Sequence, residues 1–294
     1  MNRPQVDGLV VVDKEPGWTS HDVVAKLRGI LGTRKVGHSG TLDPDATGVL
    51  LVGTGSVTRL LRFLTVLPKS YTGEILLGAE TSTLDASGEV TATYDMSAVT
   101  FDDVRAAAAG LTGDIMQVPP MVSAVQVGGR RLHELARAGI EVERAARPVT
   151  VHRFEVVATD DPLVFRIDVQ CSSGTYIRSL AADVGSALGG GAHLRDLRRT
   201  GIGSFTVDQA RTIDKIDVDA LLPPATALRD YPDVVVDAAV AAAIANGKVL
   251  PADTFEITGE GPWAMVNEAG ELLALYEHHK PGTVKPAVVL ARAQ

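Results

Sequence analysis

The sequence predicts an α+β fold in which a mixed, largely antiparallel central sheet is flanked by helices and followed by a small, mostly β C-terminal domain. Segments typical of strands and helices alternate, but several strand pairs are joined by short turns, which a purely parallel sheet does not allow. The 294 residues exceed one small domain. Composition also shifts at Leu221–Pro224 (LLPP). We therefore expect one domain over residues 1–228 and a second over 229–294.

The elements of the N-terminal half follow from apolar periodicity and from capping residues. Runs rich in β-branched or alternating apolar residues predict strands. Helical spacing of apolar residues that begins at Ser or Thr and ends at Gly or Pro predicts helices. In chain order we expect a strand over 8–12, a helix from Thr19 or Ser20 to about Leu31, an irregular loop over 36–47, a strand over 48–52, a helix over 56–67, a strand over 71–77 and a helix after Thr100.

The remaining elements are read in the same way. Pro119–Pro120 opens an arginine-rich excursion, assigned to about 121–150, with a short helix near 133–138. Two strands joined at Asp160–Pro162 and a helix that ends in three glycines follow. The expected ranges are strands over 149–157 and 163–171, a helix over 176–188, a helix over 234–245, and short strands over 264–267, 271–276 and 287–291.

Composition excludes several classes of protein. Hydrophobic residues make up 45% and charged residues 22% of the chain, as in ordinary folded proteins and unlike disordered ones. The single cysteine, Cys171, excludes a disulfide framework and a multi-cysteine metal site. The N-terminus lacks a signal-like segment, and no run approaches the roughly 20 apolar residues of a membrane span. We expect a cytoplasmic protein with no membrane association.

Charge is unevenly distributed along the chain. A net charge of −8 argues against a surface that binds nucleic acid non-specifically. However, residues 121–153 contain six arginines against three acidic residues, and residues 171–199 contain four against two. Local basic surface on an acidic protein fits a specific polyanion site, while the alternative is a set of solvated helix faces.

The loop Gly37–Gly48 (GHSGTLDPDATG) has the highest density of reactive side chains. Pro44 favours an extended backbone at Asp43, and the flanking glycines permit close approach of another backbone. A carboxylate held in this way can act as a nucleophile or a general base. The alternative is an Asx-turn residue, which is common before proline. Asp45 and His38 are too few to indicate a metal site.

A second group of residues is Cys171–Arg178 (CSSGTYIR), where a strand turns at Gly174 toward a helix. An arginine near that helix start can pair with a carboxylate or a phosphate through two parallel donors. The alternative assigns Arg178 to the helix surface and Tyr176 to the core. Spacing alone does not choose between them.

Taken together, these segments resemble the TruB family of bacterial tRNA pseudouridine synthases, over roughly residues 8–205. The pieces in family order are Asp13–Ser20 (DKEPGWTS), Val36–Gly48, Lys69–Tyr71 (KSY), Thr81–Gly88 (TSTLDASG), Pro119–Ala124 (PPMVSA), Gly174–Arg178 (GTYIR) and Gly191–Arg199 (GAHLRDLRR). Two departures are Glu15 before Pro16 and the small Val122, where family members often have an aromatic residue. The C-terminal region resembles only weakly the small RNA-binding PUA-type domain of such enzymes.

The resemblance implies conversion of uridine 55 in the T-loop of tRNA to pseudouridine by a monomer, with no metal, other cofactor or protein partner. By position it makes Asp43 the catalytic aspartate, and it places the other residues in substrate binding. Tyr71 matches the tyrosine that stacks on the target base, and Arg178 matches the arginine that pairs with the aspartate. His38 matches a histidine that enters the space left by the flipped nucleotide. Leu197 matches an apolar residue of the active-site wall, and Tyr176 lies in the same motif as Arg178.

Other classes of function remain to be separated from this one. A non-enzymatic RNA-folding module would need the basic segments and not Asp43. An enzyme that modifies uridine in another RNA would keep Asp43, Tyr71 and Arg178 and differ in the excursion or the C-terminal region. A metal-dependent hydrolase would need clustered carboxylates and histidines, which the sequence does not offer. The resemblance also implies that Arg178 favours the ionised form of Asp43.

Overall fold

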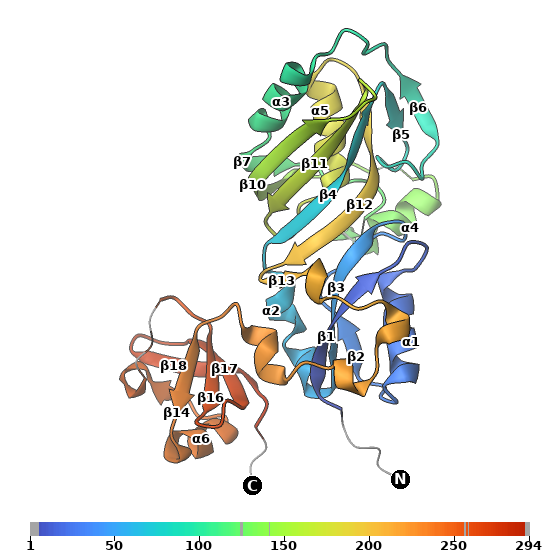
Figure 1. The fold of residues 1–294 in the computed structure, drawn as a ribbon. Coiled ribbons are helices and arrows are strands. Elements are labelled where there is room, and N and C mark those ends of the chain that lie inside the picture. The colour runs from blue at the N-terminus through green and yellow to red at the C-terminus, as the bar shows by residue number, and fades with distance from the viewer. Residues whose placement is uncertain (1–5, 124–125, 141, 256, 258, 292–294) are drawn as a thin grey trace.

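The computed structural model describes residues 6–123, 126–140, 142–255, 257 and 259–291, and Figure 1 shows its path. The larger sheet contains β1 (Gly8–Lys14), β2 (Val36–His38), β3 (Thr47–Thr54), β4 (Lys69–Leu77), β7 (Gly113–Gln117), β10 (Arg147–Ala158), β11 (Val164–Cys171), β12 (Ala192–Ile202) and β13 (Phe205–Thr206). The helices before residue 190 are α1 (Ser20–Ile30), α2 (Leu61–Thr65), α3 (Phe101–Gly110), α4 (Leu132–Arg137) and α5 (Ile177–Ala187).

Three smaller groups complete the fold. Two hairpins are β5 (Ala79–Thr81) with β6 (Val90–Thr93) and β8 (Gln126–Val127) with β9 (Arg130–Arg131). The smaller sheet contains β14 (Asp233–Val236), β15 (Leu250–Pro251), β16 (Trp263–Asn267), β17 (Leu272–His278) and β18 (Thr283–Val289), with α6 (Ala238–Ala245) beside it. Short 3₁₀ turns include η1 (Gly55–Arg59) and η5 (Pro224–Leu228).

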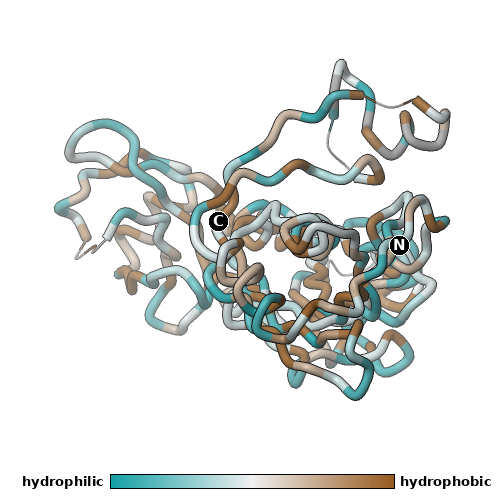
Figure 2. Tube along the Cα trace, turned by 90° about the horizontal axis from the view of Figure 1, so that it is seen from above, coloured by the Kyte–Doolittle hydropathy of each residue, from teal (hydrophilic) through white to brown (hydrophobic). Residues whose placement is uncertain are grey.

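The strand pairings confirm the predicted fold class. The larger sheet runs in the order β1-β3-β12-β4-β11-β10-β7, with β2 beside β3 and β13 beside β12. Its pairings are antiparallel except for β12 with β3. The smaller sheet runs β14-β16-β17-β18-β15 and makes the C-terminal region mostly β. Figure 2 separates the two units and shows the segment that contains β8, β9 and α4 standing away from both.

Two expected helices differ from the structure. Residues 234–245 were predicted as one helix, but β14 takes the first residues and pairs in parallel with β16. The β-branched run Val234–Val236 suits a strand, and Asp237 then caps α6 by accepting a hydrogen bond from the Val240 amide at 2.8 Å. The helix predicted over 56–67 is divided into η1 and α2. Strand β12 was not predicted, because charged residues and one glycine interrupt its apolar alternation.

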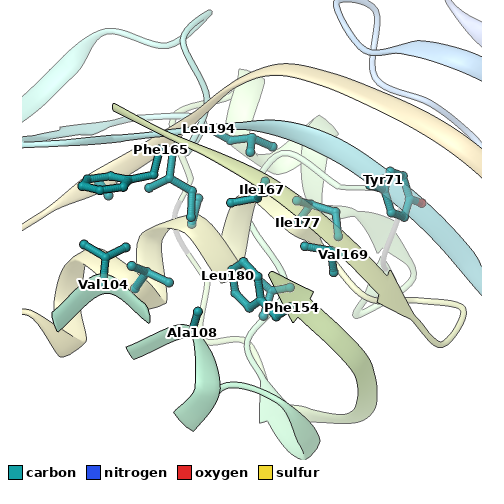
Figure 3. Packing of buried hydrophobic residues seen from close by; sticks show 14 of the residues in the cluster. Tyr71, Val104, Ala108, Phe154, Phe165, Ile167, Val169, Ile177, Leu180 and Leu194 are labelled. Atoms are coloured by element: carbon teal, nitrogen blue, oxygen red, sulfur yellow. The ribbon is translucent and has the colours of Figure 1, made fainter. Parts of the chain in front are cut away.

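Apolar clusters fix the elements around the sheet. One face of β4, β10, β11 and β12 is covered by α3 and α5, with Ile75, Phe165 and Leu180 in the cluster between them (Figure 3). A second cluster lies under α1. A third joins both units, because Leu64 and Leu67 near α2 share it with Leu275 of β17. The Arg62 guanidinium also donates to the carbonyl of Ala287 in β18 at 2.9 Å.

None of the helices in the described ranges is long and apolar enough to cross a membrane.

Candidate active site

The loop that carries Asp43 connects β2 to β3 and lies against β12. Gly48, with φ of +97°, begins the return into β3. A Cβ atom at Gly48 would collide with the carbonyl oxygen of Arg199, so the close approach of β3 and β12 requires glycine there. The glycines of this loop predict close approach of another backbone, and β12 is that neighbour.

Asp43 forms an ion pair with Arg178. The Arg178 Nε lies 3.0 Å from Asp43 Oδ2, and its Nη1 lies 3.5 Å from Oδ2 of Asp85. The guanidinium also donates to the carbonyls of Thr83 and Val122, each at 2.8 Å. Arg178 is buried, with 4% of its side chain exposed. Its donors are therefore directed at fixed acceptors on three segments, and Asp43 is one of them.

Asp85 was quoted within a motif but given no role by the sequence analysis. Its Oδ1 accepts hydrogen bonds from the hydroxyls of Thr83 and Ser87, at 2.6 and 2.5 Å. The amide of Ala86 donates to the carbonyl of Leu194 at 2.9 Å, which docks this loop on β12. Asp85 is thus held beside Arg178 by its own loop, so Arg178 lies between two carboxylates.

Lys14 ties the preceding turn to the Asp43 loop. Its buried Nζ donates to the carbonyls of Glu15, Trp18 and Pro44 at 2.9, 2.7 and 2.8 Å. Burial lowers the pKa of Lys14 to about 8, although Asp45 and Asp43 act in the opposite direction. Nothing in the motif Asp13–Ser20 predicts this role for Lys14. Lys14 fixes the residue that follows Asp43.

Two further buried cations, Lys69 and Arg199, lie close to Gly40 in the same loop. Arg199 donates to the carbonyls of Val49 and Gly40 at 2.7 and 3.2 Å. Lys69 Nζ donates to the carbonyls of Thr65 and Leu67 at 2.6 and 2.7 Å. Burial, followed by the charge of Arg199, lowers the pKa of Lys69 to about 8. Lys69 thus binds backbone carbonyls, whereas Arg199 binds backbone carbonyls and also interacts with the phenol of Tyr71.

Two cavities meet at Asp43 and Arg178. The first, of about 420 Å³, extends past Asp85, Val122 and Leu194. The second, of about 270 Å³, brings together five of the six residues singled out by the sequence analysis, which are Asp43, Tyr71, Tyr176, Arg178 and Leu197. His38 lines neither cavity. The carboxylate of Asp43 therefore has space on two sides.

Tyr71 and Tyr176 belong to different walls of the second cavity. Tyr71 is buried on β4, and Figure 3 shows it at one end of the apolar cluster with its oxygen directed away from the other labelled residues. Burial raises its pKa, which keeps the phenol protonated. Tyr176 precedes α5, and its backbone amide and carbonyl both bond to the side-chain amide of Gln117, at 2.8 and 3.0 Å.

Leu197 reaches the cavity because β12 is irregular. The register of β12 against β4 shifts between Arg195 and Arg198. Asp196, inside this shift, has φ of +53°, which is uncommon for a residue other than glycine. Residues held in such backbone regions cluster at functional sites. The irregularity places Leu197 among the residues that line both cavities.

The pKa of Asp43 departs from the expectation that an arginine partner would depress it. Burial is the largest influence and raises the pKa of Asp43 above its ordinary value of 3.8, and Asp85 raises it further. Arg178 and Lys14 lower it by less than this. Protein atoms crowd the carboxylate, although 42% of the side chain is exposed at the cavity surface. Arg178 orients the carboxylate and only partly offsets the effect of burial.

The predicted excursion is only partly within the described residues. Residues 124–125 and 141 lie outside them, and the short helix predicted near 133–138 corresponds to α4. The guanidinium of Arg144 donates to the carbonyl of Pro119 at 3.0 Å, which closes the base of the excursion. Arg130 is exposed.

Comparison with known proteins places this geometry in a family. The model of the TruB family pseudouridylate synthase N-terminal domain matches residues 28–177, and that of the tRNA pseudouridylate synthase B C-terminal domain matches residues 178–231. The tRNA pseudouridine synthase B of Streptomyces coelicolor is 49% identical over 93% of this chain and 94% of that protein. Its counterpart from Geobacillus thermodenitrificans is 43% identical over 97% and 99% of the two chains.

Solved structures share the fold. A chain of a Cbf5–Nop10–Gar1 complex superposes with a TM-score of 0.75 and 28% identity, covering 97% of this chain and 85% of that chain. A chain of an H/ACA RNP bound to a substrate RNA that contains 2′-deoxyuridine gives a TM-score of 0.74 and 26% identity, covering 98% and 86%. Both similarities extend through the smaller sheet.

Proposed function

The chain belongs to the TruB family of pseudouridylate synthases, and from this membership we propose that it isomerises uridine 55 in the T-loop of tRNA, with Asp43 as the catalytic residue. The relatives named tRNA pseudouridine synthase B support tRNA as the substrate and an isomerase as the class of enzyme. The observation that carries the residue assignment is the Arg178–Asp43 pair, at 3.0 Å, in a cavity that Tyr71 also lines.

The target base has to leave the loop before it can react. A stacked nucleotide does not expose its glycosidic bond to a side chain, so enzymes of this kind rotate it out of the RNA. Unstacking costs free energy, and base–aromatic stacking supplies about 1–3 kcal/mol per base in return. The cavity of about 270 Å³ offers Tyr71 as the aromatic surface and Leu197 as an apolar wall.

The reaction breaks the bond between N1 and C1′, rotates the uracil and joins C5 to C1′. The proton lost from C5 is balanced by one gained at N1, so no atom enters or leaves overall. Asp43 acts on the sugar or the base as a carboxylate, and Arg178 occupies its Oδ2. This orientation leaves Oδ1 as the atom available to the substrate. Fixed orientation of the reacting groups is itself a large part of catalysis.

The residues around Asp43 then have separate functions. Arg178 positions Asp43 and is itself held by Asp85 and by two backbone carbonyls. Tyr176 forms part of the cavity on the α5 side. His38 enters the space left by the flipped nucleotide, at the edge of the loop rather than inside the cavity.

RNA affinity comes from regions outside the cavity. The basic excursion of residues 121–150 contacts the phosphates of the T-arm, and the C-terminal domain, residues 229–294, is a PUA-like RNA-binding domain that follows the catalytic domain, residues 1–228. We propose that the protein acts as a monomer in the cytoplasm and requires no protein partner. Because arginine–phosphate contacts release counterions, affinity falls as salt rises.

The test is single-turnover pseudouridine formation by Asp43→Asn on an isolated T-arm stem-loop and on full-length tRNA. We expect the variant to fold and bind RNA, and to lose more than about a thousandfold in rate, because amide lacks the charge and nucleophilicity of carboxylate. Substantial activity would remove Asp43 from the reaction.

Three further outcomes separate the alternatives. Wild-type protein that binds and refolds tRNA without forming pseudouridine would support an RNA-folding module. Pseudouridine formed in another RNA, with none at position 55 of tRNA, would support a different substrate. Activity confined to full-length tRNA would show that recognition extends beyond the T-arm.

A further inference from the structure

His38 has a neighbour that neither the sequence analysis nor the cavities identify. The rings of His21 and His38 meet edge to face, with their centroids 5.3 Å apart and their planes at 86°. His38 is half-buried in β2, whereas His21 is exposed near the start of α1. Aromatic rings favour this perpendicular arrangement, which restricts the torsion angles of both side chains. The contact joins α1 to the beginning of the Asp43 loop.

The first turn of α1, which carries His21, is itself held in place by a capping box. Thr19 and Asp22 form a capping box, in which the Asp22 amide donates to Thr19 Oγ1 at 3.1 Å and the Thr19 amide donates to Asp22 Oδ2 at 2.9 Å. Such boxes fix the start of a helix. Ser20, adjacent to His21, accepts a hydrogen bond from the Leu42 amide at 2.9 Å. Two consecutive residues of α1 thus contact this part of the chain, one at His38, where the loop begins, and the other at Leu42, directly before Asp43.

We propose that His21 is a positioning residue for the RNA substrate, because it holds the His38 ring in the orientation that takes the place of the displaced nucleotide. This inference rests on the proposed function. His21 does not contact the reacting atoms in this proposal and influences RNA binding only by orienting His38. Without the contact, the His38 ring must be ordered when RNA binds, and affinity decreases by that cost.

The environment of His38 supports this assignment. Burial, followed by the charges of His21 and Arg199, lowers the pKa of His38, which favours a neutral ring. A neutral ring is suited to lie between bases, where a charged one would lose its hydration. The contact with His21 is the aromatic contact found for His38 among the described residues.

The experiment compares His21→Ala, His21→Phe and His38→Ala with the double variant His21→Ala/His38→Ala, and uses His152→Ala as a control. His152 is an exposed histidine on β10 and lines neither cavity. The probe is a T-arm stem-loop with 2-aminopurine next to the target uridine, whose fluorescence reports unstacking. Dissociation constants and single-turnover rates at saturating enzyme are measured for each variant.

We expect His21→Ala to weaken RNA binding by about three- to tenfold, which is the change in affinity that corresponds to the loss of one edge-to-face contact. The fluorescence change at a fixed protein concentration should decrease with it. The rate of the saturated complex should remain within about twofold of the wild type, since Asp43 and Arg178 are untouched. His21→Phe should restore affinity, and the double variant should bind no more weakly than His38→Ala.

Additive effects in the double variant, or a His21→Ala variant that behaves like His152→Ala, would overturn the inference. So would a failure of His21→Phe to restore binding when it folds normally. These outcomes differ from a failure of the proposed function, which would appear as wild-type protein without activity on tRNA or as an active Asp43→Asn variant.

Discussion

The two buried arginines beside the cavity differ in their partners. Arg178, 4% exposed, faces the carboxylates of Asp43 and Asp85. Arg199, 1% exposed, donates to the backbone carbonyls of Val49 and Gly40 and faces no carboxylate of the described residues, although it also interacts with the phenol of Tyr71. Both side chains contact the loop that carries Asp43. Arg178 pairs with Asp43 itself, and Arg199 donates to the carbonyl of Gly40.

This difference separates two uses of a buried positive charge. A guanidinium between two carboxylates fixes the angle of a reacting group and influences its ionisation. A guanidinium bound to carbonyls satisfies buried backbone acceptors and connects strands, here β3 and β12. Charge alone does not distinguish these uses, so the two arginines are expected to respond differently to the same substitution.

Of the substitutions that test this difference between the two arginines, Arg178→Lys should have the largest effect. Lysine keeps the charge but lacks the planar donors that face Asp43, Asp85 and the carbonyl of Val122. We expect the single-turnover rate to fall about a hundredfold, as for a misplaced catalytic group, while RNA affinity stays nearly unchanged. Arg153→Lys, at an exposed arginine paired with Asp168, is the control. Loss of affinity with a preserved rate would show that Arg178 is a phosphate contact instead.

Arg199→Lys is expected to act chiefly on stability. A single ammonium cannot reach both Val49 and Gly40, so one buried carbonyl loses its donor, and the free energy of unfolding should fall by about 1–3 kcal/mol. Urea denaturation measures this change. Arg198→Lys is the matched control, because Arg198 is 35% exposed and pairs with Asp13. An unchanged unfolding free energy with a large loss of rate would place Arg199 with Arg178.

The two buried lysines predict how stability depends on pH. Their pKa values in the folded protein are about 8, against 10.5 in the unfolded chain, so between these values the unfolded state binds more protons. Stability therefore increases with pH from about 8, by up to about 1.4 kcal/mol per pH unit for each lysine. Burial raises the pKa of Cys171 to about 11, which opposes the increase above pH 9.

The window to measure is therefore pH 8–9, by urea denaturation. Lys69→Met should reduce the slope there by about half, because it removes one of the two contributing ammonium groups. A slope that is flat in the wild type would show that the lysines keep their ordinary pKa values in the folded protein.

The smallest expected effect concerns the ionisation of Asp43. Its pKa is raised, and the reaction requires the carboxylate, so kcat/KM should decrease as pH falls through that raised value. Asp85→Asn removes a negative charge that raises the pKa of Asp43, so the acid limb should move to lower pH. Asp45→Asn should move it less, since Asp45 has the smallest influence of the four charged neighbours. An acid limb that moves upward in Asp85→Asn would reverse the assigned electrostatics.

Local patterns predicted much of the fold, because capping residues and apolar periodicity are local properties. Thr100, for example, caps α3 with the capping box that its sequence favours. Strand β12 was missed because its pairing with β3 and β4 depends on residues far away in sequence. The segment Val234–Val236 was assigned to a helix because the alanines that follow it dominate the window.

The sequence predicted those residues of the site that lie in recognisable motifs. Asp43, Tyr71, Tyr176, Arg178 and Leu197 come together at one cavity, although their catalytic and binding functions remain proposals. Lys14, Asp85 and Arg199 lie in quoted motifs, but only the fold shows that Lys14 bonds to Pro44 and that Asp85 faces Arg178. His21 has no motif role at all, since its contact with His38 joins a helix to a strand.

The apolar cluster shared by the two units has an evolutionary consequence. Leu64 and Leu67 lie in the same cluster as Leu275, and Arg62 donates to the carbonyl of Ala287. A change in side-chain volume on one of these surfaces leaves a gap or an overlap on the other. The units are therefore not freely exchangeable among homologues, and residues of α2 and β17 should covary across species.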